Sequence, residues 1–135
     1  YYDLMPGFDL TVYPSYYEPW GYTPLESMAF KVPTITTDLA GFGLWVNTLK
    51  GHYATLQDGV KVIHRTDYNY SEVADAIRDT LTEYSAFSPK EIEKVRKNAA
   101  AVAEQALWKY FIKNYYVAYD VALRNAAKRL EENKF

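Results

Sequence analysis

The sequence of 135 residues has no cysteine, which excludes a disulfide framework and a thiolate metal site. A chain without cysteine suits a reducing compartment, so we expect a cytoplasmic protein. No apolar run approaches the ~18 residues that a membrane-spanning helix needs, so we expect no membrane partner. The sequence also lacks an initial methionine and a targeting segment, and its abrupt start predicts a part of a longer protein.

Neither sign of charge dominates, since 15 basic residues face 17 acidic ones and the net charge is −2. Nucleic-acid-binding domains carry a basic patch, so we expect no nucleic-acid partner. The only histidines are His52 and His64, and neither has a carboxylate or a second histidine at a useful spacing in the sequence. We therefore expect both to be structural or surface residues.

Tyrosine is abundant, with 14 copies. Its side chain joins an apolar body to a polar tip, which favours partly hydrated surfaces or clefts that contact sugars. The simpler alternative is that most of the tyrosines pack on helices.

Short runs of β-branched and aromatic residues predict strands over residues 10–13, 32–37 and 60–63. A strand, a helix and a strand in so short a span predict a βαβ unit with parallel strands. Ala40–Gly43 is predicted to be a glycine-rich turn. Three strands make a thin sheet, so we expect a partial α/β fold that lacks its first strands.

Capping patterns predict where the helices begin. Thr23 is the predicted N-cap of the first helix, Ser71 of a second over 72–84, and Ser88 of a third through a capping box with Glu91. The last helix, from Trp108, is predicted to turn four residues inward: Phe111, Tyr115, Tyr119 and Ala122. We expect a βαβ-type core over residues 1–86 and closing helices over 87–135.

Two carboxylates, Glu18 and Glu26, flank a tight turn that leads into the first helix. With Thr23 as N-cap, Pro24 takes the first helical position and Glu26 the third. The free amides of a first helical turn bind anions, and a diphosphate is the expected guest. Each part alone has a simpler explanation: Glu26 only closes a capping box, and Glu18 is only a solvated loop carboxylate.

Ligands of open parallel sheets bind outside the carboxyl ends of the strands. The loops 15–22 and 38–43 both leave such ends, so we expect them to lie side by side. Glycines in these loops allow close approach of a ligand to the backbone. The aromatic residues expected as walls of this cleft are Tyr16, Tyr17, Trp20, Tyr22 and Phe42.

The segments Pro14–Glu26 and Val32–Gly43 closely resemble the glycogen synthases of the eukaryotic type. Those proteins are retaining glucosyltransferases of the GT-B architecture, with two Rossmann-like domains. The strong match covers residues 8–46, and a weaker one continues to the end. Many retaining GT-B enzymes share the carboxylate pair, whereas the run Tyr-Tyr-Glu-Pro-Trp-Gly-Tyr-Thr-Pro is far more specific.

The resemblance implies a role for each matching residue. Glu18 is the implied catalytic residue, lying against the donor glucose near the anomeric centre and stabilising the positive charge that develops there. Glu26 binds the ribose hydroxyls, and Tyr1 stacks on the base. The other implied donor-binding residues are Trp20 and the three residues that receive the distal phosphate, Gly21, Tyr22 and Thr23.

The implied donor is a nucleoside-diphosphate glucose, UDP-glucose for this branch, with ADP-glucose left open. The implied acceptor is the end of an α-1,4-glucan, and the resemblance implies no metal and no other cofactor. An Arg and Lys pair that neutralises phosphate, together with most acceptor contacts, is expected in a preceding half of the enzyme. This chain alone should therefore be inactive. The oligomeric state is open, a homo-oligomer included.

The sequence departs from the family pattern at Asp38 and Ala40, where Asn and Ser are expected. No arginine-rich helix that senses glucose 6-phosphate is found, so activation by a sugar phosphate is not expected. Two alternatives stay open: another retaining GT-B transferase with a different donor and acceptor, and a non-catalytic carbohydrate-binding module. The second would bind glucans without needing Glu26.

Overall fold

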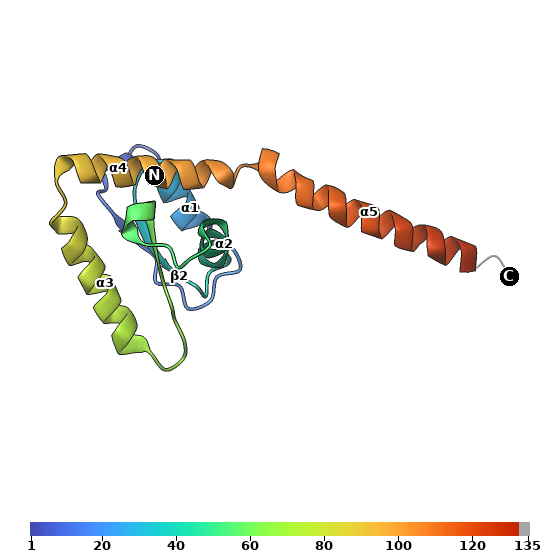
Figure 1. Ribbon diagram of the computed structural model, residues 1–135, viewed down its shortest axis with the longest axis horizontal. Helices are drawn as coiled ribbons and strands as arrows, with labels where there is room; N and C mark the ends of the chain where they lie inside the picture. The colour runs from blue at the N-terminus through green and yellow to red at the C-terminus, as the bar shows by residue number, and fades with distance from the viewer. Residues whose placement is uncertain (133–135) are drawn as a thin grey trace. The chain divides into compact units, whose positions relative to one another are not determined.

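The computed structural model describes residues 1–132 and divides into a compact unit, Tyr1–Glu104, and a second unit that begins at Gln105 (Figure 1). The strands are β1 (Thr11–Val12), β2 (Thr34–Thr37) and β3 (Val60–Ile63). The helices are α1 (Tyr22–Ala29), α2 (Gly41–Lys50), α3 (Tyr70–Ser85), α4 (Pro89–Gln105) and α5 (Trp108–Glu132), and the 3-10 turns are η1 (Met5–Gly7) and η2 (Leu56–Asp58).

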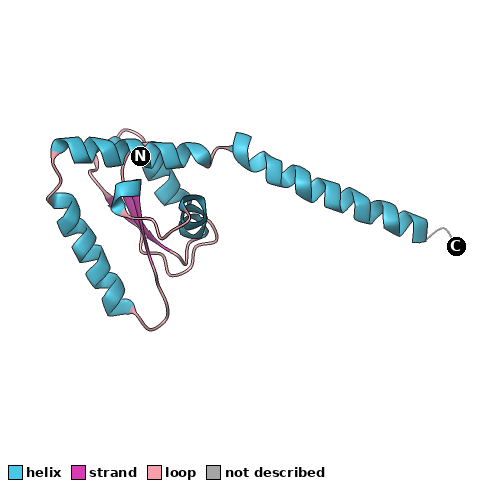
Figure 2. Cartoon of the chain, viewed as in Figure 1, coloured by secondary structure: helices cyan, strands magenta, loops and turns pink. Residues whose placement is uncertain are grey.

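The three strands form one parallel sheet in the order β1-β2-β3, with helices packed around it (Figure 2). Thr11 pairs with Thr34 at one end of the sheet, and Thr37 pairs with Ile63 at the other. The prediction of an α/β fold with a parallel sheet is confirmed. All three carboxyl ends therefore lie at one edge, and the loops that follow them are neighbours.

Helices cover both faces of the sheet, and the side chains along β3 alternate between these two faces. Val60 and Val62 pack with residues of α1, α2 and α4, among them Met28 and Phe42. Ile63 points to the other face, where it packs with Ile35 of β2 and Val73 of α3. The buried strands thus separate two apolar layers, which is the arrangement of a doubly wound sheet.

Helix α2 corrects the sequence interpretation, which placed only a glycine-rich turn after β2. The chain instead turns directly into a helix of ten residues that begins at Gly41. Both glycines of its first turn are sites of close backbone approach: a Cβ at Gly41 would lie 2.2 Å from the Pro19 carbonyl, and one at Gly43 would lie 2.2 Å from the Thr37 carbonyl. The glycines therefore serve packing, not a turn, and composition alone does not distinguish the two.

Two of the three predicted helix caps are wrong. The N-cap of α1 is Gly21, two residues before Thr23, and the N-cap of α3 is Asn69, two residues before Ser71. The third is confirmed at the start of α4, where the Glu91 carboxylate accepts hydrogen bonds from the Ser88 amide and hydroxyl at 2.7 and 2.6 Å. These bonds favour the ionised form and lower the pKa of Glu91.

Helix α5 contains no buried residue, so the predicted inward face of Phe111, Tyr115, Tyr119 and Ala122 is wrong. It is the only described helix that lies wholly in the second unit, and an apolar stripe on a helix is buried only where another element packs against it. Two aromatic side chains of α5 contact each other, since the ring centres of Trp108 and Tyr115 lie 4.8 Å apart.

None of the helices within residues 1–132 combines the length and the apolar character of a membrane-spanning segment.

The turn before β3 generates a stability prediction, because Gly59 lies directly against α4. Its φ is +85°, and a Cβ there would lie 2.2 Å from the Ala99 amide nitrogen. Gly51 has a similar φ of +74° with nothing within 4 Å, which makes it a matched control. Gly51→Ala should cost about 1–2 kcal/mol of unfolding free energy from backbone strain alone.

Gly59→Ala must in addition push α4 away from the sheet, so it should cost at least ~2 kcal/mol more than the control. Urea denaturation of both variants measures the difference. Equal losses of stability would contradict the close packing of the turn on α4.

Candidate functional site

The loop that carries Glu18 runs alongside the start of α2, beyond the carboxyl ends of β1 and β2. The Glu18 amide donates to the Leu39 carbonyl at 3.2 Å, and the Gly41 amide donates to the Glu18 carbonyl at 3.0 Å. Glu18 and Ala40 form an isolated parallel bridge. The two loops therefore lie side by side, as the sequence predicts.

Helix α1 begins directly after this loop. Its N-cap, Gly21, has a φ of 107° in the left-handed region, which a glycine adopts without strain. Tyr22 and Thr23 are the first two helical residues and Pro24 the third, so the first turn has two amides without an intrahelical acceptor and one residue that has no amide hydrogen. These amides and the helix dipole favour an anion at this place.

The side chain of Glu18 lies beside this helix start, because a Cβ built on Gly21 would be 3.6 Å from Glu18 Cγ and 3.2 Å from Pro24 Cγ. The structure thus brings one predicted carboxylate and the predicted phosphate-binding backbone together. Any larger residue at position 21 would fill the space between them.

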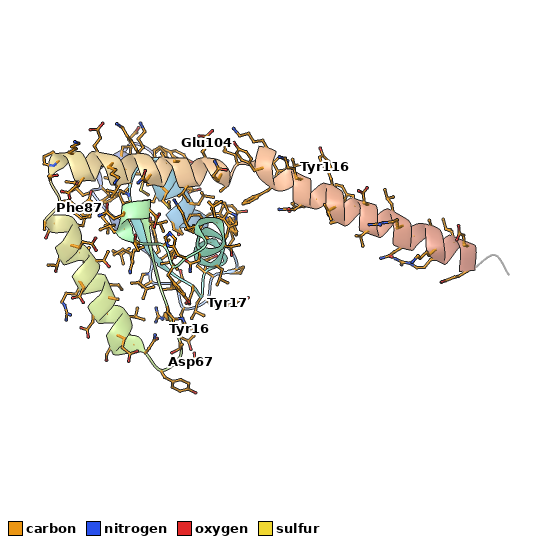
Figure 3. All side chains as sticks on the ribbon, viewed as in Figure 1. Tyr16, Tyr17, Asp67, Phe87, Glu104 and Tyr116 are labelled. Atoms are coloured by element: carbon orange, nitrogen blue, oxygen red, sulfur yellow. The ribbon has the colours of Figure 1, made fainter. Side chains whose placement is uncertain are left out.

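The aromatic residues around the loop divide into two groups. Phe42 is fully buried, and Trp20 is half-buried with its ring 6.0 Å from that of Phe42. Phe42 is therefore a core residue and not a cleft wall, which corrects the prediction. The residues exposed around the loop are Tyr16, Tyr17 and Tyr22, and Figure 3 shows Tyr16 and Tyr17 at the loop end of the compact unit.

Tyrosine exposure is general in the compact unit, where every tyrosine except Tyr13 and Tyr84 is exposed. This supports the hydrated-surface interpretation over packing within a core.

The second carboxylate, Glu26, is bonded to the predicted base-stacking residue. The Tyr1 hydroxyl donates to Glu26 Oε2 at 2.8 Å, although 25 residues separate them in the sequence. This hydrogen bond, with the nearby negative charge, raises the pKa of Tyr1 to about 12. Tyr1 and Glu26 are thus neighbours in space, and nothing in the spacing of the sequence indicates this bond.

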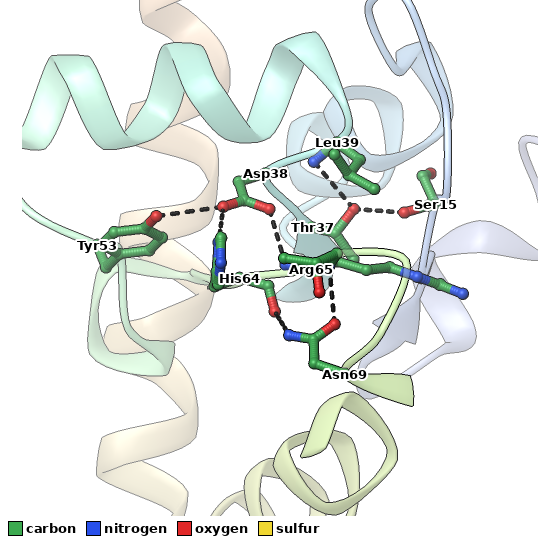
Figure 4. Close-up of polar contacts among 9 residues, drawn as sticks. Ser15, Thr37, Asp38, Leu39, Tyr53, His64, Arg65 and Asn69 are labelled. Carbon is green, nitrogen blue, oxygen red and sulfur yellow. Dashed lines mark hydrogen bonds and ion pairs between the residues drawn. The ribbon is translucent and has the colours of Figure 1, made fainter. Parts of the chain in front are cut away.

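His64 is an exposed surface residue, as the sequence predicts, but it has a carboxylate partner that the sequence spacing does not indicate. His64 Nδ1 lies 2.6 Å from Asp38 Oδ2, and Tyr53 donates its hydroxyl to the same oxygen at 3.2 Å (Figure 4). Asp38 directly follows β2 and His64 directly follows β3, and these two parallel strands are neighbours. Their places at the strand ends, and not their spacing in the sequence, could have indicated that the two side chains meet. His52 Nδ1 lies 2.9 Å from the carbonyl oxygen of the adjacent Tyr53.

Within residues 1–132, no three His, Asp or Glu side chains are grouped as a metal site would require.

The Tyr1–Glu26 bond generates a pH prediction. In the folded chain the pKa of Tyr1 is raised from its ordinary value of 10.0 to about 12, because losing the proton breaks the bond and places two negative charges together. The stabilisation that this bond provides is therefore complete below pH 10.0 and is lost as the pH rises through about 12.

Replacing the carboxylate in Glu26→Gln removes the negative charge, and we expect the pKa of Tyr1 to fall toward 10.0. An NMR titration of chain labelled at tyrosine Cζ measures it, with Tyr1→Phe used to assign the signal. Tyr53, whose pKa is raised by its hydrogen bond to Asp38, is the internal control and should not change. A Tyr1 signal that titrates alike in both proteins would contradict the bond.

Comparison with known proteins extends these observations. The sequence model of the family described as glycogen synthase matches residues 1–134. The chain is 31% identical to a glycogen (starch) synthase of Neurospora crassa, over 93% of this chain and 18% of that protein. It is 30% identical to isoform 1 of the Saccharomyces cerevisiae enzyme and 29% identical to the liver enzyme of Mus musculus, each over 93% of this chain and 18% of the relative.

The matched region is thus about a fifth of the length of these relatives. Because the family model covers almost every residue, both the loop of Glu18 and the helices that follow the sheet lie within the match. The chain belongs to the glycogen synthase family.

Proposed function

We propose that this chain is the donor-nucleotide-binding part of a retaining glucosyltransferase that extends an α-1,4-glucan from a nucleoside-diphosphate glucose. The observation that carries the proposal is the placement of Glu18 beside Gly21 and the amides that begin α1. A carboxylate and a set of preorganised amide donors then lie side by side at the sheet edge where ligands of this fold class bind.

The proposed mechanism divides the reacting charges between these two groups. As the bond between glucose and the diphosphate breaks, negative charge builds on the diphosphate, and the amides of Tyr22 and Thr23 stabilise it. Positive charge builds on the sugar ring, and the Glu18 carboxylate stabilises that charge. Gly21 allows the diphosphate to approach the backbone closely.

The nucleoside is assigned to the other end of the proposed donor site, which Glu26 of α1 and Tyr1 form. Glu26 binds the ribose hydroxyls, and Tyr1 stacks on the base. Because the Tyr1 hydroxyl already donates to Oε2 of Glu26, that oxygen is shared with the ribose or released to it when the donor binds. Trp20 borders the donor site, and its ring contact with the buried Phe42 holds it there.

The remaining components of the enzyme are part of the same proposal. We assign the acceptor glucan and its contacts to parts of the enzyme outside these 135 residues, since the relatives are much longer. UDP-glucose is the proposed donor, and no metal ion takes part. We further propose a cytoplasmic location.

A nucleotide titration tests the proposal. UDP, ADP and glucose are titrated separately into the labelled chain, and amide shifts are followed by NMR. UDP should shift the signals of Gly21–Glu26. Removing the ribose partner in Glu26→Ala should weaken UDP binding about 10- to 100-fold, the value of hydrogen bonds to a charged group.

Glu83→Ala is the matched control, because Glu83 is an exposed glutamate on α3, away from the loop. It should leave UDP binding unchanged. A larger response to ADP would assign the donor to the adenine nucleotides. Glucan binding that survives Glu26→Ala, with no response to any nucleotide, would overturn the transferase assignment in favour of a carbohydrate-binding module.

A further inference from the structure

A cluster of polar side chains occupies the sheet edge next to the candidate site. We define the Asp38 cluster as Asp38, Tyr53, His64 and Arg65, drawn in Figure 4. Asp38 follows β2 directly, and His64 and Arg65 follow β3 directly. The proposed function uses none of these residues.

Asp38 is the centre of the cluster. Its side chain is only 9% exposed, and a carboxylate so far from water needs hydrogen-bond donors. Oδ1 accepts the Arg65 amide hydrogen at 2.9 Å, and Oδ2 faces Tyr53 Oη and His64 Nδ1 at 3.2 and 2.6 Å. Because a carboxylate only accepts, the His64 Nδ1 carries the hydrogen. The Asp38 carboxylate thus holds three donors, two from the loop after β3 and one from the loop before it.

Arg65 links Asp38 to the loop of the candidate site. Its backbone is held by Asp38, and its guanidinium donates to the Pro14 carbonyl and lies 5.1 Å from the centre of the Tyr16 ring. A planar guanidinium can make both contacts at once. Tyr16 is two residues before Glu18, so the guanidinium restrains the segment that enters the proposed catalytic position.

The turn that supports Arg65 is itself held in place. The Asn69 side chain donates to the His64 carbonyl at 3.0 Å and accepts the Thr66 amide hydrogen at 2.7 Å. On the other side, the Thr37 hydroxyl donates to the Ser15 carbonyl at 2.5 Å. The Pro14–Tyr16 segment is therefore restrained by side chains from both β2 and the loop after β3.

We propose that Asp38 is a positioning residue for Glu18, acting through Arg65 on the Pro14–Tyr16 segment. This inference rests on the proposed function, in which Glu18 lies at the donor glucose. The nucleoside end of the site, Glu26 and Tyr1, has no contact with the Asp38 cluster among the interactions described above. Loss of Asp38 should therefore disturb the sugar end of the donor site and leave the nucleoside end intact.

The experiment compares two ligands that differ only in the glucose. Calorimetry on the full chain gives the Kd of UDP and of UDP-glucose for wild type and for Asp38→Ala. We expect the variant to bind UDP-glucose about tenfold more weakly, because a small misplacement of a positioned group is costly, while its Kd for UDP stays within about twofold. A merely structural role would weaken both ligands together.

Asp58→Ala is the matched control. Asp58 is a partly buried aspartate that accepts hydrogen bonds from Thr55 and pairs with Lys50 at 3.3 Å, before β3 and away from the cluster. It should lower stability without changing either Kd. Arg65→Met removes the contacts to Pro14 and Tyr16 with Asp38 intact, and it should reproduce the selective loss, whereas Arg65→Lys should recover part of the affinity for UDP-glucose.

A ligand-free readout separates this inference from the proposed function. The Tyr16 ring should shift the side-chain proton signals of Arg65 upfield, and that shift should disappear in Tyr16→Leu and in Asp38→Ala. A wild-type chain that binds neither ligand would overturn the proposed function, and the Arg65 signals would still test the restraint. A persistent Arg65 shift in Asp38→Ala, or equal loss of both ligands, would overturn the role of Asp38.

Discussion

The candidate site depends on one backbone contact, the approach of the Pro19 carbonyl to Gly41. A side chain at position 41 would lie 2.2 Å from that oxygen, so only a glycine lets the two segments meet. Their contact continues the parallel pairing of β1 and β2 beyond the strands, through the hydrogen bonds that Glu18 makes to Leu39 and Gly41. The position of Glu18 is thus determined by backbone pairing, which is more rigid than a free loop.

The two ends of the proposed donor site are held by different means. Glu18 is placed by the backbone of the segment that starts α2, whereas Glu26 lies within α1 and is bonded to Tyr1 from the start of the chain. A change at one end need not reach the other, because Gly21 at the helix start separates them in the sequence and adopts a backbone conformation of its own. In the proposed function, such separate supports let the sugar and the nucleoside be recognised independently.

The sequence predicted those features that depend on local patterns. The β-branched runs located all three strands, and the Ser88–Glu91 pair located the start of α4, because strand propensity and capping act within a few residues. Helix α2 was missed because Gly41 and Gly43 usually signal turns. Here they serve close backbone contacts instead, Gly41 with the distant Pro19 and Gly43 with Thr37 at the end of β2. The bonds of Asp38 and of Tyr1 were missed for the same reason, since both join distant segments.

The aspartate at position 38, where the family pattern leads us to expect asparagine, fits the donors that surround it. A carboxylate has two acceptor oxygens and no donor. Both oxygens of Asp38 accept hydrogen bonds, which come from Arg65, Tyr53 and His64. An asparagine has one acceptor oxygen and an amide group that only donates. Its oxygen would keep the bond to the Arg65 amide, but its amide group would face His64 and Tyr53, and His64 Nδ1 would then have to accept a hydrogen bond. The carboxylate of Asp38 therefore selects the tautomer of His64 that carries its hydrogen on Nδ1.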